Sequence, residues 1–280
     1  MIDLHTHSAQ SDGTDSPTGL VEAAAAAGLT TVALTDHDTT SGWDEARAAA
    51  ERVGIALVRG SELSTRHAGI SVHLLAYLFD PEHPGLRAEM QATLDDRLPR
   101  LQRIVQRLAD DGYELTWEDV AAQMEEGATP GRPHVADALV ARGYAPDRSA
   151  VFHDLLYSGS PYYVPHYAPA TADAVRLVRE AGGVPVLAHP FAATRGRTIW
   201  PDDVRSLTAA GLLGIEVHHR DHDPDGVTLA RDLARELDLV PTGSSDYHGS
   251  GKVNRLGERT TDPGSLERIE AAATGTPVVR

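Results

Sequence analysis

The chain has 280 residues, no cysteine, and 41 acidic against 25 basic side chains, which gives a formal net charge of −16. This composition excludes disulfide scaffolds and thiolate metal sites, and it argues against tight binding to long nucleic acid, itself a polyanion. The apolar runs are too short to cross a bilayer and we find no signal peptide, so we expect a cytoplasmic protein without a membrane partner.

Strand-like and helix-like segments alternate along most of the chain. Strands are predicted at 3–7, 30–38, 55–63, 70–79, 184–190, 214–219 and 239–248, with helices at 17–28, 41–54 and 170–183. Ser41 is expected to cap the second helix. Residues 81–167 are charged and helix-rich, and they show no strand alternation. Seven strands alternating with helices predict parallel pairing in an α/β, TIM-like (β/α)7 barrel that is interrupted once.

Histidines and acidic residues follow nearly every predicted strand. They are His5, His7, Asp12, Asp36, His37, Glu62, His189, Asp246 and His248, whereas His73 lies in the middle of its strand. In a parallel barrel all strand carboxyl ends open on one face, where the active sites of this architecture lie. Taken alone, the MIDLHTHSAQSDG stretch could equally hold two exposed histidines at a strand end. The repeated placement predicts a shared site.

Imidazoles with carboxylates, and no thiolate, favour Zn, Mn or Fe over Ca. Close packing of these groups would be costly without a compensating cation. His5, His7, Asp12, His37, Glu62, His73, His189, Asp246 and His248 make nine donors. Because a catalytic metal takes about three protein ligands, nine donors fit three ions better than one.

The same motifs resemble those of a known family. HTHSAQSDG, LTDHD, GSEL, the single His73, AHP (188–190) and SSDYH (244–248) match, in this order, the motifs of the PHP (polymerase and histidinol phosphatase) family of metal-dependent phosphoesterases. The resemblance implies a distorted seven-stranded barrel with two or three divalent metal ions. It implies that one ion is held by His5, His7, Glu62 and Asp246, a second by Asp12, His37 and His248, and a third by Glu62, His73 and His189.

The helix-rich segment 81–167 interrupts the barrel of 1–80 and 168–280, and it resembles the inserted domain of the PHP subgroup that acts on nucleotides and short oligonucleotides. Its GRPH motif implies that Arg132 and His134 face the substrate phosphate, and an arginine fork suits phosphate geometry. The alternative is that Arg132 caps a turn and His134 opens a helix. His219 and His222 match subgroup positions near the pocket, as acid–base or substrate-contacting residues.

Other polar residues are expected to play supporting parts. Asp36 is a better partner for orienting an imidazole than a metal ligand. Surface exposure is the expected state of His67, His83, His153 and His166. The sequence contains no complete phosphate-binding loop, nucleophile elbow or dinucleotide-binding fingerprint.

The sequence therefore predicts a phosphoric ester hydrolase in which clustered metals activate a hydroxide for attack on phosphorus. The expected substrates are nucleotide-like phosphomonoesters, such as a nucleoside 3′,5′-bisphosphate or AMP, and the 5′ end of short oligonucleotides. A phosphatase for histidinol phosphate or another small molecule is the alternative, and the net charge disfavours proofreading on long DNA. A non-catalytic metal-binding module is less favoured, because degenerate relatives would be expected to lose some donors. No obligate protein partner is evident.

Overall fold

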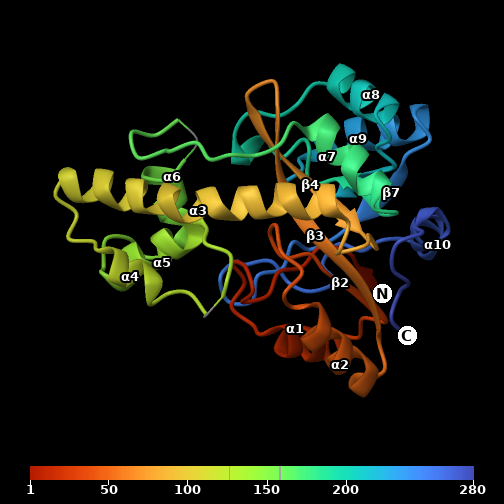
Figure 1. The fold of residues 1–280 in the computed structure, drawn as a ribbon, viewed down its shortest axis with the longest axis horizontal. Helices are drawn as coiled ribbons and strands as arrows, with labels where there is room; N and C mark the ends of the chain where they lie inside the picture. The colour runs from red at the N-terminus through yellow and green to blue at the C-terminus, as the bar shows by residue number, and fades with distance from the viewer. Residues whose placement is uncertain (126, 158) are drawn as a thin grey trace.

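The structure, a computed structural model, describes residues 1–125, 127–157 and 159–280. Seven strands form one sheet in chain order (Figure 1). The strands are β1 (Ile2–Asp3), β2 (Thr31–Leu34), β3 (Ala56–His67), β4 (Ile70–Tyr77), β5 (Val184–Leu187), β6 (Gly214–His218) and β7 (Val240–Gly243). A bridge between Thr6 and Tyr247 brings the two edges together beyond β1 and β7. The predicted distorted seven-stranded α/β barrel is confirmed.

The expectation of uniformly parallel pairing is wrong for one strand. β4 runs antiparallel to both β3 and β5, whereas the other neighbouring strands pair in parallel. Only Ala68 and Gly69, both at positive φ (46° and 78°), separate β3 from β4, so the chain turns back in a tight hairpin without a crossover helix. His73 therefore faces Ser64 in the extended end of β3. The reversal places His73 near Glu62 although it lies in mid-strand.

Helices cover the outside of the barrel. They are α1 (Pro17–Ala26), α2 (Trp43–Val53), α7 (Thr171–Glu180), α8 (Pro201–Ala209), α9 (Pro224–Glu236) and α10 (Pro263–Ala272), with a short 3₁₀ helix η1 (Ala193–Arg195). Ser16 caps α1 by accepting a hydrogen bond from the Gly19 N–H. The predicted cap of α2 is wrong: Gly42 holds that position, and Ser41 Oγ donates to Gln10 instead.

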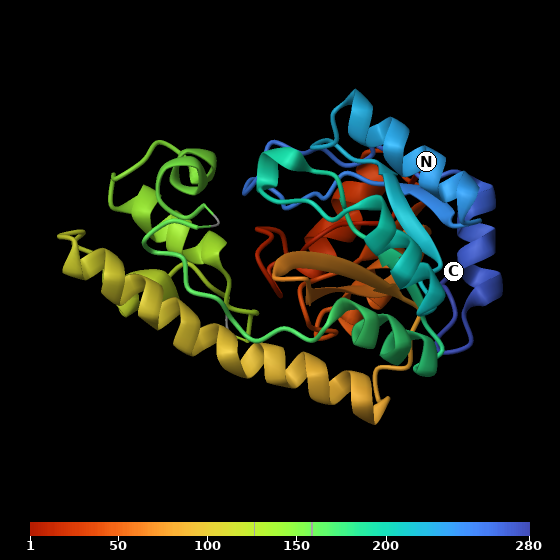
Figure 2. The same ribbon diagram turned by 90° about the horizontal axis from the view of Figure 1, so that it is seen from above.

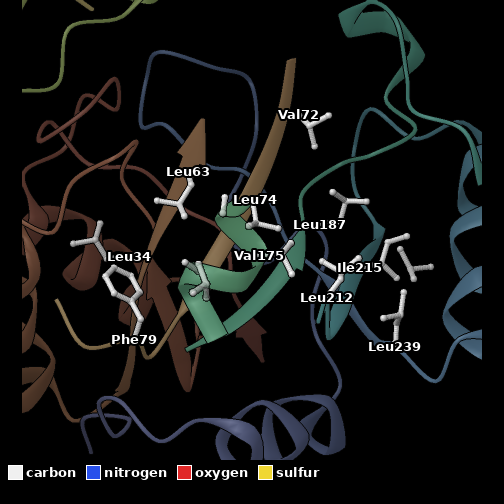
Figure 3. Packing of buried hydrophobic residues seen from close by; sticks show 14 of the residues in the cluster. Leu34, Leu63, Val72, Leu74, Phe79, Val175, Leu187, Leu212, Ile215 and Leu239 are labelled. Atoms are coloured by element: carbon white, nitrogen blue, oxygen red, sulfur yellow. The ribbon is translucent and has the colours of Figure 1, made fainter. Parts of the chain in front are cut away.

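Alternate strand residues pack on opposite faces of the sheet. Leu74 belongs to the hydrophobic cluster shared with the surrounding helices, and Figure 3 shows it beside Val175 of α7. Leu75, the next residue, belongs to a second cluster with Val58 and Val186 of the neighbouring strands. Because side chains alternate along a strand, one cluster fills the layer between sheet and helices and the other fills the barrel. Burying each such leucine contributes roughly 1.5–3 kcal/mol.

Four further helices lie to one side of the barrel (Figure 2). They are α3 (Pro84–Asp110), α4 (Trp117–Ala121), α5 (Arg132–Ala141) and α6 (Arg148–Asp154). The long α3 begins beside α7, where Leu86 joins the barrel core. Its second half carries Leu101, Ile104 and Leu108, which form a separate buried cluster with residues of α4, α5 and α6. One helix thus links the cluster between sheet and helices, to which Leu86 belongs, to this separate cluster.

None of the described helices is both long and apolar enough to span a membrane.

Candidate metal centre

The predicted metal-binding residues, although scattered along the chain, meet at one mouth of the barrel. The structure brings eight of them into three overlapping groups, within each of which the ligand atoms lie within 4.8 Å of one another. The first group is His5, His7, Glu62 and Asp246; the second is His7, Asp12, His37 and His248; the third is His37, Glu62 and His73. His189 lies outside these groups, but its Nε2 is 3.0 Å from Glu62 Oε1. All nine residues thus share one site.

The first group is built on the segment that follows β1. His5 Nε2 and His7 Nε2 lie 3.1 Å apart, and each lies within 3.2 Å of Glu62 Oε2. Asp246, just beyond β7, places Oδ1 3.5 Å from both imidazoles. The four side chains are buried, so their charges are poorly screened by water.

The second group depends on a loop that folds back over His7. A side chain at Gly13 would collide with the His7 carbonyl oxygen, so this return requires glycine. It brings Asp12 Oδ1 3.2 Å from His248 Nε2, and Asp12 Oδ2 3.7 Å from His37 Nε2. The glycine of the SDG run is therefore needed for steric reasons, because it lets the loop bring Asp12 into the second group.

The third group lies where β3 extends past Glu62. Glu62 Oε1 accepts a hydrogen bond from His73 Nδ1 at 2.7 Å, and its Oε2 lies 3.3 Å from His37 Nδ1. Glu62 therefore contacts members of all three groups. A single carboxylate shared in this way is suited to bridging two ions.

Three of the six non-glycine residues with positive φ in the described part of the chain lie at this mouth of the barrel. Asp38, His189 and Asp246 have positive φ values of 52°, 28° and 53° without being glycine. Such conformations cost about 1–3 kcal/mol each and persist where the surrounding structure compels them. Two of the three residues are predicted metal ligands, so the strain aims those side chains into the site.

The sequence analysis missed Glu216, which lies in β6 and is fully buried. Its Oε1 accepts hydrogen bonds from His5 Nδ1 at 3.0 Å and from Ser244 Oγ, and its Oε2 accepts the His189 N–H at 2.6 Å. A hydrogen bond at Nδ1 fixes the tautomer of His5 and turns Nε2 towards the first group. The clue in the sequence is a carboxylate inside the otherwise apolar GIEV run of a buried strand.

Two basic residues, also absent from the predicted set, contact Asp246. Arg195 donates to Asp246 Oδ2 at 2.5 Å and also binds Asp221, and Lys252 lies 3.0 Å from the same oxygen. Oδ2 of Asp246 therefore faces two cations while Oδ1 faces the histidines. Arg195 ends the 3₁₀ helix η1 and Lys252 lies beyond β7, so both contacts come from outside the strands.

Charges within the site shift several pKa values strongly. Burial alone would raise the pKa values of Glu62 and Asp246, but histidines around Glu62, and Lys252 and Arg195 around Asp246, hold both well below their usual range. Burial alone would lower the pKa of His5, yet Glu62, Glu216 and Asp246 raise it well above its usual value. Glu62 and Asp246 thus stay ionised, and their negative charges favour a cation bound between them.

The residues present fit divalent cations. Among the residues that the structure describes, His37 Nδ1 and His248 Nε2 are buried yet make no hydrogen bond. Buried ring nitrogens without a partner are costly in a folded protein unless something else binds them. Each lies in one of the groups above, beside ionised carboxylates. A set of imidazole and carboxylate donors of this kind suits a transition metal.

Asp36 lies beneath the site rather than in it. Its carboxylate accepts hydrogen bonds from the Ser8 N–H, Ser8 Oγ and Ser11 Oγ at 2.8, 2.6 and 2.6 Å. Ser11 Oγ is in turn 3.4 Å from His7 Nδ1. Burial raises the pKa of Asp36 to about 7, against the lowering effect of the two serines. Asp36 therefore reaches an imidazole only through Ser11.

The two remaining predicted histidines, His219 and His222, differ in how far neighbouring residues engage their ring nitrogens. Both ring nitrogens of His222 are engaged by the backbone, at Val217 O and Phe191 N. His219 Nδ1 accepts the Asp221 N–H, whereas its buried Nε2 makes no hydrogen bond to any described residue and lies 3.5 Å from Asp246 Oδ2. Of the two, only His219 keeps a nitrogen directed at the site.

Arg132 and His134 begin helix α5. His134 Nδ1 accepts the Gly131 N–H at 3.1 Å, so this imidazole closes the first turn of the helix. Arg132 donates to Leu156 O at 2.8 Å and lies over the rings of Phe152 and Tyr163. Both residues thus have structural contacts. Burial lowers the pKa of His134, and the nearby Asp12 carboxylate of the second group acts in the opposite direction.

Comparisons with known proteins find relatives that cover most of this chain. Residues 3–138 match the PHP domain. The chain is 35% identical to the 3′,5′-nucleoside bisphosphate phosphatase of Chromobacterium violaceum over 93% of this chain and 92% of that protein. It is 37% identical to the phosphoribosyl 1,2-cyclic phosphate 1,2-diphosphodiesterase of Eggerthella lenta over 92% and 98%. It is 32% identical to a 5′-3′ exoribonuclease of Haemophilus influenzae over 88% and 89%.

A solved structure shows the same fold over nearly the whole chain. It comes from Bifidobacterium adolescentis, and its name assigns it to the metal-dependent phosphoesterases. The two structures superpose with a TM-score of 0.95 at 42% identity, over 98% of this chain and 96% of the other.

Proposed function

Since this chain belongs to the PHP family and is a metal-dependent phosphoric ester hydrolase, we propose that it removes phosphate from nucleotide-like monoesters. A nucleoside 3′,5′-bisphosphate and AMP are the first substrates to test, followed by the 5′ end of short oligonucleotides. The bisphosphate phosphatase and exoribonuclease relatives support this substrate class.

The observation that carries the proposal is that Glu62 belongs to two of the three groups of donors, and its Oε2 also lies 3.1 Å from His7 Nε2 and 3.3 Å from His37 Nδ1 of the remaining group. One carboxylate and the histidines around it are arranged to hold several cations within a few ångströms of each other. We propose two to three divalent ions of Mn, Zn or Fe, held by the nine residues named from the sequence. Ions bound there would lower the pKa of a coordinated water and neutralise charge on the phosphate oxygens.

The other residues of the site act on the substrate and its protons. Arg132 has guanidinium N–H groups beyond the one given to Leu156 O, and a planar fork of donors matches phosphate oxygens. His134, near Asp12, would contact a phosphate from the same helix start. His219 Nε2, which lies 3.5 Å from Asp246 Oδ2, would supply the proton that the leaving alkoxide requires. Asp36 would keep His7 oriented through Ser11.

We also propose that residues 81–167 form a domain that covers the substrate. Two contacts support it: Arg148 at the start of α6 donates to Asp12 O at 3.1 Å, and the Thr129 N–H bonds to Gln10 O at 2.9 Å. Both reach the loop that carries Asp12. A small phosphorylated molecule is the expected ligand, since a net charge of −16 would repel a long polyanion.

A phosphodiester substrate is the second candidate. The relative from Eggerthella lenta, named as a cyclic phosphate diphosphodiesterase, favours it at 37% identity. Histidinol phosphate remains a further small monoester to compare. Side-by-side kcat/KM values on a nucleoside bisphosphate, a cyclic phosphodiester and histidinol phosphate would rank these substrate classes.

The test combines metal analysis with a matched pair of variants. Protein purified without added metal and reloaded with Mn²⁺ should hydrolyse the bisphosphate, and strong chelation should abolish turnover. Glu62→Gln should lose bound metal and nearly all activity, whereas Glu236→Gln, the same change at an exposed residue of α9, should retain both. Activity that survives complete metal removal would refute the mechanism. Full metal loading without hydrolysis of any phosphoester would favour a non-catalytic module.

A further inference from the structure

Three arginines converge beside the metal centre on a chain that is otherwise strongly acidic. Arg97 and Arg100 come from α3 and Arg132 from α5, and we call them, with His166 at their edge, the arginine cluster. Arg97 and Arg100 are each only 5% exposed. Burying a guanidinium group is expensive unless a carboxylate or another anion pairs with it.

The cluster contains more positive charge than its partners neutralise. Arg97 pairs with Asp38 at 2.5 Å, and its buried Nε makes no hydrogen bond among the described residues. Arg100 and Arg132 have no carboxylate within ion-pair distance in the described part of the chain. Arg100 donates Nε–H to Val164 O at 2.7 Å, and Arg132 donates to Leu156 O at 2.8 Å. No residue that the structure describes accepts a hydrogen bond from their other guanidinium N–H groups.

The arginines lie close enough to repel one another. Burial, Arg132 and Arg97 together lower the pKa of Arg100 to about 9. Arg100 and Arg132 also lie against one aromatic ring, with guanidinium carbons 5.8 and 5.6 Å from the centre of Tyr163. Repulsion between these guanidinium groups does not stabilise the fold, and an anion bound between them would offset the repulsion.

His166 completes the cluster and corrects the expectation that it lies on the surface. Both of its ring nitrogens are buried, and neither makes a hydrogen bond to any residue that the structure describes. Burial and the nearby charges of Arg100, Arg97 and Arg66 hold its pKa far below the usual value, so the ring is neutral and can donate one hydrogen bond. A neutral donor is compatible with three neighbouring cations and with an anion.

The cluster borders the third metal group. Arg97 Nη2 donates to Ser64 Oγ at 2.8 Å, and Ser64 pairs across the sheet with His73. Asp38, the partner of Arg97, directly follows His37. An anion in the cluster would therefore lie beside a phosphate at the metal centre.

We propose that the arginine cluster binds a second, non-reacting phosphate of the substrate, with Arg100 and His166 as residues that determine this preference. The proposal rests on the proposed function and deepens it: the preferred substrate carries two phosphate groups, one at the metals and one here. Arg132 then contacts the phosphate that stays on the product.

A purely structural role for these arginines is the competing explanation. Arg100 does bind the backbone at Val164, but Arg107 already ties the adjacent residues to α3 by donating to Pro161 O and Tyr163 O at 2.9 Å. Arg107 does so from an exposed position, at no cost in buried charge. It is therefore the matched control, with the same residue type, helix and target segment but outside the cluster.

The experiment compares Arg100→Gln, His166→Gln and Arg107→Gln on an adenosine 3′,5′-bisphosphate and on adenosine 3′- and 5′-monophosphates. Losing one charge-assisted contact should lower the ratio of kcat/KM for bisphosphate over monophosphate by about tenfold or more in the first two variants. Arg107→Gln should leave the ratio unchanged. An equal loss on all substrates, or the same loss in Arg107→Gln, would show a structural role and overturn the proposal.

A binding measurement separates this proposal from the proposed function. Inorganic phosphate should raise the Tm of the metal-free wild type, because Arg100 and Arg132 offer it cationic donors that pair with no carboxylate of the described residues. Arg100→Gln should abolish that rise and Arg107→Gln should keep it. If Arg100→Gln does not fold, His166→Gln decides by the same measurement. If both cluster variants keep the rise in Tm with phosphate, the proposal is overturned even if the enzyme hydrolyses nucleotides. If only the cluster variants lose that rise, the proposal is supported even if the true substrate is not a nucleotide.

Discussion

Replacing Glu216 by glutamine tests whether a residue that touches no substrate tunes the metal centre. The variant keeps the size of the side chain but removes its charge and one acceptor. In the wild type both carboxylate oxygens accept, one from His5 and Ser244 and the other from the His189 N–H at 2.6 Å. A glutamine amide can satisfy only one side, whichever way it is turned.

The size of the effect follows from these contacts. A hydrogen bond to a charged acceptor is worth about 1.5–3 kcal/mol, so losing one corresponds to roughly a tenfold to hundredfold change in an equilibrium constant. The loss should fall on metal affinity, because His5 without its Nδ1 partner no longer holds Nε2 towards Glu62 and Asp246. Far-ultraviolet circular dichroism should remain that of the wild type.

The assay is competition for Mn²⁺ or Zn²⁺ against a chelator of known affinity, followed by kcat/KM at saturating metal. Glu236→Gln supplies the control, since Glu236 is exposed and binds Arg205 far from the site. We expect the control to bind metal like the wild type. Should Glu216→Gln also match the wild type in metal affinity, the argument that this carboxylate orients His5 is wrong.

Three further predictions address the pH dependence, the core and the link between α6 and the site. Burial raises the pKa of Asp3 from 3.8 to about 6, so the folded protein binds this proton more tightly than the unfolded chain does. The bound proton stabilises the fold fully below pH 3.8, and this stabilisation is lost as the pH rises through about 6. An asparagine has no such proton to lose, so the free energy of unfolding of metal-free Asp3→Asn should rise relative to that of the wild type by up to about 3 kcal/mol across this window. Tyr77→Phe, which removes the hydrogen bond from the buried Tyr77 hydroxyl to Leu4 O at 2.7 Å, should lower the free energy of unfolding in urea by about 1–2 kcal/mol. Arg148→Gln should weaken metal binding about tenfold, because Asp12 loses the contact at its carbonyl oxygen.

Each of these outcomes has a contrary result. A constant stability difference between Asp3→Asn and wild type from pH 4 to 7 would mean that burial does not shift this carboxyl group. If Tyr77→Phe unfolds at the same urea concentration as the wild type, a water molecule donates to Leu4 O in place of the tyrosine hydroxyl. For the third, Arg142→Gln is the control, since Arg142 forms an exposed ion pair with Asp119; equal metal affinities in both variants would remove the proposed role of Arg148.

Local features of this protein were readable from its sequence because they depend on neighbours along the chain. The predicted helix at 17–28 is α1, ending at Ala26, and the strands that were expected are all present, although several are shorter than predicted. Residues just beyond strand ends, such as His37 and His189, were placed correctly at one mouth of the barrel. Their position follows from the strand pattern and from the direction in which parallel strands run.

Other features required segments far apart in sequence to be brought into contact. The hairpin that reverses β4 arises from a two-residue turn that replaces a crossover helix, and this reversal alone explains the position of His73. Glu216 contacts a histidine 211 positions away, and His166 lies near arginines of helix α3 and strand β3. The sequence determined which chemical groups were available and which face of each strand they occupy, because those depend on residue type and backbone periodicity. Only the tertiary structure decided which buried charges are balanced and which are left without a partner, because that balance is set by long-range packing.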